Sequence, residues 1–174
     1  MGAEDAAGAA GQDGASLLDT YQSEREPHVR DYIEAAVRLG ELITARATAA
    51  VAPPAGSGVP RMELIEPRLG PGLCGGLPEP RGRVAPQPLG DGSAGMDNCI
   101  GYCFAALARS GFAGKLPADL RAMLAARDVA LVADAAYEPW LEDIGTEAVL
   151  VRPDRYVLSA AHDANEMRAL VAAL

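Results

Sequence analysis

Apolar positions along this chain follow a helical spacing in one region and a strand-like spacing in another. Between residues 27 and 46 they recur every three or four residues, as on one face of an amphipathic helix. Between residues 96 and 174, short apolar runs of strand length alternate with helical segments. Residues 47–95 follow neither pattern. The chain is therefore predicted to be an α/β protein, with an N-terminal helical segment, a connector and a folded C-terminal domain.

The N-terminal helical segment is predicted to span residues 16–46. Ser16 and Asp19 have the spacing of a capping box. Pro27 cannot continue an undisturbed helix but suits the first turn of a new one, so a kink or short break is expected there. Residues 1–15, rich in Ala, Gly and acidic groups, are predicted to be disordered. The apolar face of this helix is expected to pack on another surface. The residues of this face are Val29, Tyr32, Ile33, Ala36, Val37, Gly40 and Ile43.

Residues 47–95 are rich in Pro and Gly and are predicted to be a linker. Four glycines could suggest a phosphate-binding loop, but neither a strand nor a Lys-Ser/Thr pair accompanies Gly70, Gly72, Gly75 and Gly76. The linker interpretation is therefore preferred. Asp91 and Asp97 flank a glycine-rich turn and are expected to be solvated loop carboxylates.

The C-terminal domain is predicted to span residues 96–174, with a β-hairpin over 149–157 as its centre. Pro153 and Asp154 reverse the chain in this hairpin, and Arg152 and Arg155 are expected to brace the turn by pairing with Asp154 or neighbouring carboxylates. Further elements are expected as strands at 100–107 and 129–132, the second of them buried, helices at 117–126 and 163–174, and a helical turn at 138–141. Asp163 is expected to be the N-cap of the last helix, with Glu166 at its N3 position. The order β-α-β-β-β-α is that of a thioredoxin-like domain.

Few side chains in the sequence suggest catalysis. Cys99 and Cys103 have three residues between them on a predicted strand, whereas a thioredoxin motif has two and lies at a helix N-terminus. They are expected to pack as small hydrophobes, in a domain without a CxxC motif. His28 and His162 have no cysteine or ligand partner in a metal spacing and are expected to be solvated. No catalytic, cofactor-binding or metal-binding residue is assigned.

Charge and composition exclude several classes of protein. The net charge of the chain is -9, and no segment of the chain is basic. Binding to nucleic acid or to an anionic membrane would need such a basic segment. No apolar run approaches the roughly 20 residues that span a bilayer, and the N-terminus does not resemble a secretory signal. Cys74, Cys99 and Cys103 are an odd number without a framework spacing. A reducing, cytoplasmic location is expected.

Three separated motifs, at residues 17–28, at residues 81–88 and at residues 96–104 with 149–157, point to one family. They resemble segments of FAD-dependent aromatic hydroxylases, among them 3-(3-hydroxyphenyl)propionate hydroxylase and phenol-hydroxylase-like enzymes. Residues 17–28, LLDTYQSEREPH, resemble the segment that follows the flavin domain in this family. Residues 81–88, RGRVAPQP, are similar to its linker. Residues 96–104 and 149–157 are similar to the start and the hairpin of its C-terminal thioredoxin-like domain.

The resemblance implies FAD and NAD(P)H as cofactors of the full-length enzyme, which hydroxylates a phenolic ring. The flavin-binding motifs of the family are not found in this chain, so neither cofactor is expected to bind it alone. We expect the C-terminal portion of such an enzyme, from a truncated frame or a separate gene, whose helical segment packs on the missing flavin domain. Two alternatives remain: a free-standing thioredoxin-like association module, which could form a homodimer, and, more weakly, a thiol enzyme using Cys99 or Cys103.

Overall fold

The computed structural model describes residues 4–48, 66, 68–70, 80–87 and 100–174. It divides into two compact units, Met1–Leu73 and Cys74–Leu174. Each unit has its own described secondary structure.

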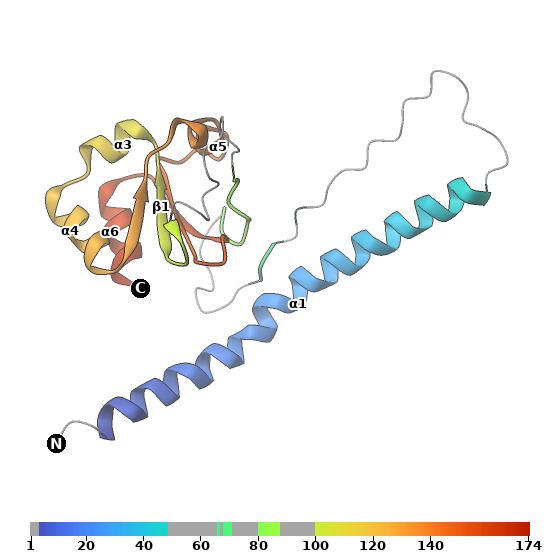
Figure 1. The fold of residues 1–174 in the computed structure, drawn as a ribbon, viewed down its shortest axis with the longest axis horizontal. Helices are drawn as coiled ribbons and strands as arrows, with labels where there is room; N and C mark the ends of the chain where they lie inside the picture. The colour runs from blue at the N-terminus through green and yellow to red at the C-terminus, as the bar shows by residue number, and fades with distance from the viewer. Residues whose placement is uncertain (1–3, 49–65, 67, 71–79, 88–99) are drawn as a thin grey trace. The chain divides into compact units, whose positions relative to one another are not determined.

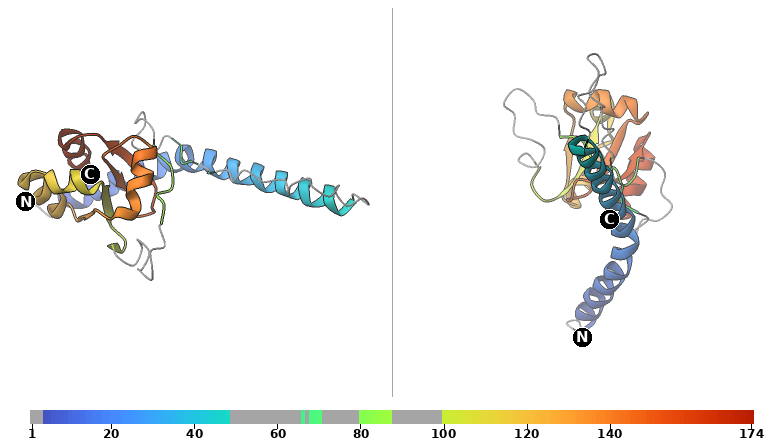
Figure 2. Two further views of the ribbon diagram at one scale, coloured as in Figure 1. Left: turned by 90° about the horizontal axis from the view of Figure 1, so that it is seen from above. Right: turned by 90° about the vertical axis from the view of Figure 1, so that its right-hand side faces the viewer.

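The first unit is built on one helix, α1, which runs from Glu4 to Thr48 (Figure 1). It begins well before Ser16, within a stretch that composition predicted to be disordered. Alanine is the strongest helix former, and extending an existing helix costs less than nucleating a new one, which favours the earlier start. Pro27 lies inside the helix, so the expected short break is absent. The other expected outcome, a kink, is present: the helix axis bends near its middle (Figure 2).

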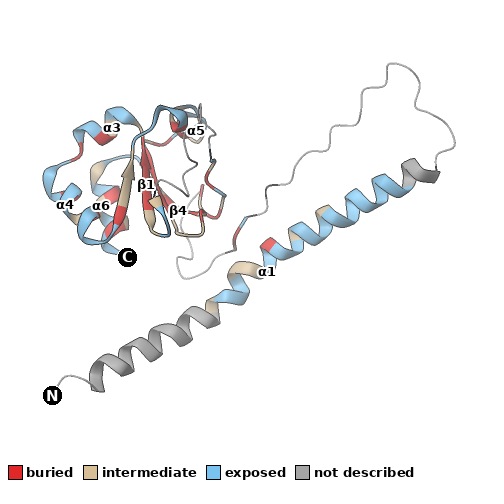
Figure 3. Cartoon of the chain, viewed as in Figure 1, coloured by how far each residue is buried: buried red, intermediate tan, exposed pale blue. Residues whose placement is uncertain are grey.

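The predicted apolar face of α1 is exposed. We call Val29, Tyr32, Ile33, Ala36, Val37, Gly40 and Ile43 the apolar stripe. Its large side chains are between 49% and 60% exposed, with Val29 lowest and Ile43 highest (Figure 3). Beside the stripe, Arg30 pairs with Glu26 and Arg38 with Glu34 at distances of 2.9 and 3.3 Å. The stripe is thus the apolar face of an amphipathic helix, and the other described residues of the first unit leave it exposed.

The second unit contains a four-stranded mixed sheet in the order β2-β1-β3-β4. The strands are β1 (Phe104–Ala108), β2 (Val129–Val132), β3 (Ala148–Val151) and β4 (Val157–Ala161). Strand β1 pairs with β2 in parallel and with β3 antiparallel, and β3 pairs antiparallel with β4. The helices are α3 (Ser110–Lys115), α4 (Ala118–Ala126), the 3-10 turn η1 (Ala135–Tyr137), α5 (Glu138–Asp143) and α6 (Ala164–Ala172). The predicted mixed α/β class is confirmed for this unit.

Alternating side chains of the central strands form two cores, one on each face of the sheet. Ala106 and Leu150 face a cluster that includes Leu120 of α4 and Met167 of α6. Leu107 and Val149 face a second cluster, with Tyr137 and Leu141 from η1 and α5. Helices α4 and α6 therefore cover one face of the sheet and α5 the other (Figure 1).

Two strand predictions need correction. Strand β1 begins at Phe104, not near residue 100, and Cys103 lies before it with its thiol directed to the Ile100 carbonyl at 2.9 Å. The expected shared strand face of Cys99 and Cys103 is therefore wrong for Cys103, while Cys99 is outside the described residues. Strand β2 was expected to be fully buried, but only Val129 is, because this strand lies at an edge of the sheet.

The predicted hairpin is confirmed as β3 and β4, and its turn is closed by Arg152 and Asp154. The two side chains form an ion pair at 2.9 Å, as expected. Arg155 behaves differently: it is only 9% exposed, has a φ of 69°, and donates to the Gly101 carbonyl. Through this hydrogen bond it ties the turn to the segment before β1.

Parts of the predicted linker belong to the folded units. Val84 forms an antiparallel bridge with Tyr156, supported by the Ala85 N–H donating to the Arg155 carbonyl at 2.8 Å. In the first unit, the Gly70 N–H donates to the Glu24 carbonyl of α1 at 2.8 Å. Asp91, Asp97, Cys74 and the glycines at 72, 75 and 76 lie outside the described residues.

Candidate functional site

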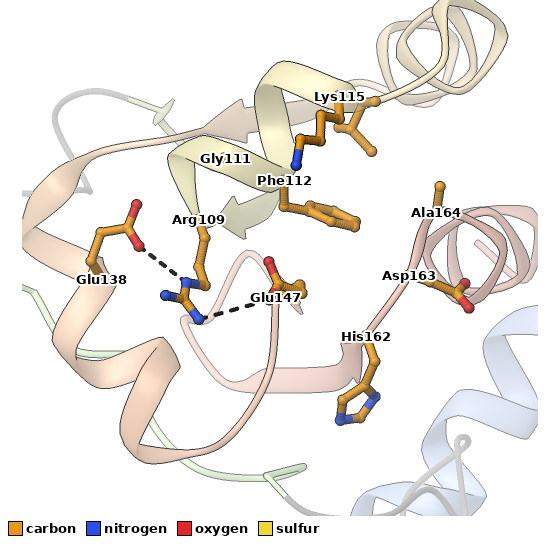
Figure 4. Close-up of a pocket in the computed structure, with 10 residues that line it drawn as sticks. Arg109, Gly111, Phe112, Lys115, Glu138, Glu147, His162, Asp163 and Ala164 are labelled. Atoms are coloured by element: carbon orange, nitrogen blue, oxygen red, sulfur yellow. Dashed lines mark hydrogen bonds and ion pairs between the residues drawn. The ribbon is translucent and has the colours of Figure 1, made fainter.

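A hollow of about 570 Å³ lies in the second unit, at the end of the sheet where β1 and β4 finish and β3 starts (Figure 4). Strand β1 ends here at Ala108, β4 ends here at Ala161, and β3 begins here at Ala148, since β3 is antiparallel to both neighbours. The residues next to these strand ends therefore converge. The lining consists of Arg109, Gly111, Phe112, Lys115, Leu116, Glu138, Glu147, His162, Asp163 and Ala164.

Arg109 is the centre of the charged side of the hollow. Its Nε lies 3.2 Å from Glu138 Oε2, and its Nη1 lies 3.7 Å from Glu147 Oε1. Its backbone N–H also donates to the Glu147 carbonyl at 2.9 Å. The guanidinium thus links the end of β1 to α5 and to the residue before β3. All three side chains are between 30% and 41% exposed, so water screens these ion pairs.

Glu138 also caps the first turn of α3. The preceding residue, Arg109, provides no side-chain cap. Glu138 Oε1 instead accepts from the Ser110 backbone N–H at 2.7 Å, across 28 residues of sequence. Hydrogen bonds from the Ser110 backbone and hydroxyl, together with the Arg109 guanidinium, lower the pKa of Glu138 below its usual 4.5. The Ser110 backbone N–H and the Arg109 guanidinium thus favour the charged form of this carboxylate.

The opposite side of the hollow is the start of α6. Asp163 is the N-cap, accepting from the N–H groups of Asn165 and Glu166 at 2.8 and 2.9 Å, as the sequence predicted. Glu166 reaches back to His162, accepting from its backbone N–H at 2.7 Å and lying 3.0 Å from its ring Nδ1. These contacts lower the pKa of Glu166. His162 is 63% exposed at its side chain, which agrees with the predicted solvated position.

The lining of the hollow does not favour a hydroxyl or thiol nucleophile or the binding of an anion. Its lining residues include no Ser, Thr or Cys that could act as a nucleophile. Both nearby helix starts already have a carboxylate acceptor, Glu138 for α3 and Asp163 for α6. Three carboxylates stand against Arg109 and Lys115, a balance that does not fit a phosphate or pyrophosphate group. The ion pairs of Arg109 make this position a polar junction between the end of β1, α5 and the start of β3.

Within each unit, the described residues that the sequence suggested as candidates form no joint site. His28 lies in the first unit and is only 9% exposed, so its predicted solvation is wrong. It contacts Tyr32 edge to face, with ring centroids 5.0 Å apart. Cys103 lies before β1 as a free cysteine. Among the described residues, no group of three or more His, Cys, Asp or Glu side chains could hold a metal ion. Within the same residues, no helix combines the length and apolar content needed to cross a membrane.

The hollow itself was not predicted, for a physical reason. Arg109, Glu138 and Glu147 come from three different elements, and no sequence spacing marks them as neighbours. Only Asp163 and Glu166 carried a local signal, the N-cap pattern that was recognised.

Comparison with known proteins gives one informative relationship. The chain is 34% identical, over 183 aligned residues, to a protein of Rhodococcus jostii (strain RHA1) named as a probable NADH-specific resorcinol 4-hydroxylase. The alignment covers 89% of this chain and 33% of that relative, so the chain spans about a third of the relative's length. No protein-family model matches the chain, and no solved structure gives a significant match. The relationship confirms the resemblance to aromatic hydroxylases indicated by the three motifs, and its extent is consistent with a C-terminal region of such enzymes.

Proposed function

From its relationship to the aromatic hydroxylases, we propose that this chain is the C-terminal region of an FAD- and NADH-dependent monooxygenase that hydroxylates a phenolic ring. The observation that carries the proposal is the 34% identity over 89% of the chain but only 33% of the resorcinol hydroxylase relative. In this proposal the flavin and the ring-binding pocket belong to the remaining two thirds. The present chain contributes structure and association.

The residues around the hollow support the proposal that the cofactor binds to the rest of the enzyme. When bound, the flavin would supply the oxygen-activating chemistry. The hollow beside Arg109 does not fit the pyrophosphate of FAD, because both helix starts are occupied by carboxylates and the lining is rich in acidic groups. We therefore assign no residue of this chain to cofactor or substrate, and the C-terminal unit carries no step of the reaction.

The strand order of the second unit supports a thioredoxin-like fold. The chain forms a parallel β1-helix-β2 unit followed by the antiparallel β3-β4 hairpin and α6. At the end of β1, where a thioredoxin would place its CxxC, this chain has Arg109, Ser110, Gly111 and Phe112. The first helical turn is capped by Glu138 instead of facing a thiol. The proposal is accordingly a thioredoxin-like domain without redox activity.

The apolar stripe of α1 supports a docking role for the first unit. An amphipathic helix gains most of its stability from packing its apolar face. Tyr32, Ile33 and Ile43 are all more than half exposed, so α1 has an apolar face without a cover among the described residues. In this proposal, the flavin-containing part of the enzyme covers it.

The test is to purify the chain with excess FAD and to measure bound flavin and NADH oxidation with resorcinol present. We expect neither stoichiometric flavin nor NADH oxidation. A yellow one-to-one complex that oxidises NADH would overturn the assignment of cofactor binding to the remaining two thirds. Analytical ultracentrifugation addresses the association module: a single well-folded oligomer would favour it, and self-association through the exposed stripe into mixed species supports the C-terminal region.

A further inference from the structure

The feature that the proposed function leaves unexplained is a contact on the first unit, where residues 68–70 lie against the bend of α1. Pro27 has no N–H, so the Ser23 carbonyl lacks its usual helical donor, and the proline ring forces the helix open at this turn. Gly70 lies at this opening. Its N–H donates to the Glu24 carbonyl at 2.8 Å.

Only glycine fits at this position. A Cβ at Gly70 would lie 2.2 Å from the Ser23 carbonyl oxygen, 3.0 Å from Pro27 Cγ and 3.3 Å from the Glu24 carbonyl oxygen. Two of these three neighbours are helix backbone and cannot move aside cheaply. Residue 70 therefore approaches the backbone of α1 so closely that only a residue without a side chain can occupy this position.

The same contact lies next to a buried position of α1. Among residues 20–44, whose side chains are described, His28 alone is buried, at 9% exposure, whereas its neighbours Pro27 and Val29 are exposed. A side chain on a lone helix cannot reach this burial without a cover. Leu69, next to Gly70, is itself 8% exposed. The two buried residues lie beside the Gly70–Glu24 hydrogen bond, one in each segment.

We propose that residues 68–70 form a strap that closes over the Pro27 bend, covers His28 with Leu69, and holds α1 in its bent form. Gly70 is the positioning residue of the strap. His28 links the strap to the apolar stripe, because its ring contacts Tyr32 edge to face at 5.0 Å. Where the proposed function holds, the strap also sets the shape in which the apolar stripe meets its partner; the strap itself does not depend on that function.

The chain offers an internal reference for testing the strap, since His28 and His162 are its two histidines. Diethylpyrocarbonate labelling followed by mass spectrometry reports both at once in the full chain. In the wild type, His162 should react rapidly and His28 slowly. In Gly70→Ala, His28 labelling should rise about tenfold while His162 is unchanged, which corresponds to a strap weakened by about 1.4 kcal/mol.

Two further variants make the test specific. Gly40→Ala is the control on the same helix. A Cβ added at Gly40 meets nothing within 4 Å, so His28 should stay protected in this variant. Pro27→Ala restores the missing N–H and closes the opening, so it should release His28 as Gly70→Ala does. If His28 stays protected in Gly70→Ala, the strap is refuted; if it stays protected only in Pro27→Ala, the dependence on the bend is refuted.

A measurement on the wild type guards against misfolded variants. The Gly70 amide, as a donor to Glu24, should exchange with deuterium more slowly than an unstructured glycine amide. Exchange at the unstructured rate would overturn the proposal without any substitution. Neither readout involves flavin or NADH, so a failed strap and a failed hydroxylase assignment give different results.

Discussion

At the scale of single residues, Glu138 joins two separate parts of the second unit. It accepts from the Ser110 N–H at 2.7 Å and pairs with Arg109 at 3.2 Å, so one carboxylate caps α3 and anchors the end of β1. The acceptor comes from α5 because Arg109, in the N-cap position of α3, cannot accept a hydrogen bond with its side chain. A cap supplied from a distant element has the same electrostatic basis as a local one.

Glu138→Gln should reduce stability in a pH-dependent way. The pKa of Glu138 is lowered from 4.5 in the folded chain, so its charged form stabilises the fold above about pH 4.5, and this contribution is lost as the pH falls through the lowered value. We expect the urea midpoint of the variant to be lower than that of the wild type at pH 7. The two midpoints should converge in acid. A difference that stays constant from pH 7 to pH 3 would contradict the assigned role of the charge.

At the scale of elements, the central strands β1 and β3 determine the packing of the second unit. All four residues of β3 are buried, and four of the five residues of β1 are buried. Alternate side chains enter the two cores, so each central strand contributes to both faces of the sheet. The edge strands β2 and β4 are only partly buried.

Leu150→Ala should be among the most destabilising changes in the second unit. Leu150 is fully buried in β3, and truncation would leave a cavity in the core formed with α4 and α6. The expected loss is about 2–5 kcal/mol. Val84→Ala is the control, since Val84 is 53% exposed, and should change stability by less than about 0.5 kcal/mol. Urea unfolding followed by the fluorescence of Trp140, the single tryptophan, measures both.

At the scale of the whole molecule, the chain combines two units of different character. The second has a sheet with a core on each face, whereas the first has a single helix with an exposed apolar stripe and a strap. The stability of the second unit therefore resides in its own contacts. The first unit depends on local hydrogen bonds and on whatever covers the stripe.

Removing the first unit should leave the second one folded. A chain of residues 74–174 is expected to unfold in urea with the same Trp140 transition as the full chain, to within about 0.5 kcal/mol, because independent units contribute additively. Replacing Ile33 by Asp in the stripe of the full chain should likewise leave that transition unchanged. A large shift in either case would show that the units depend on each other for stability.

Elements with local signals can be recognised from the amino-acid sequence alone. The hairpin turn at Pro153 and Asp154, the cap at Asp163 and the helical spacing of the stripe all depend on residues a few positions apart, and the structure contains each of them. The family resemblance likewise rested on short motifs and was confirmed by the Rhodococcus relative. Turn chemistry, capping and periodicity act within one or two turns of chain, so they can be recognised without a fold.

Contacts between residues far apart in the sequence become visible only in the folded chain. Glu138 caps α3 from 28 residues away, Gly70 contacts the helix at Glu24, and His28 is buried despite a polar, helix-surface sequence context. The continuity of α1 through Pro27 and the edge position of β2 were decided in the same way. Each outcome depends on the balance between burial, packing and hydrogen bonding across separate segments, and that balance exists only once the chain has folded.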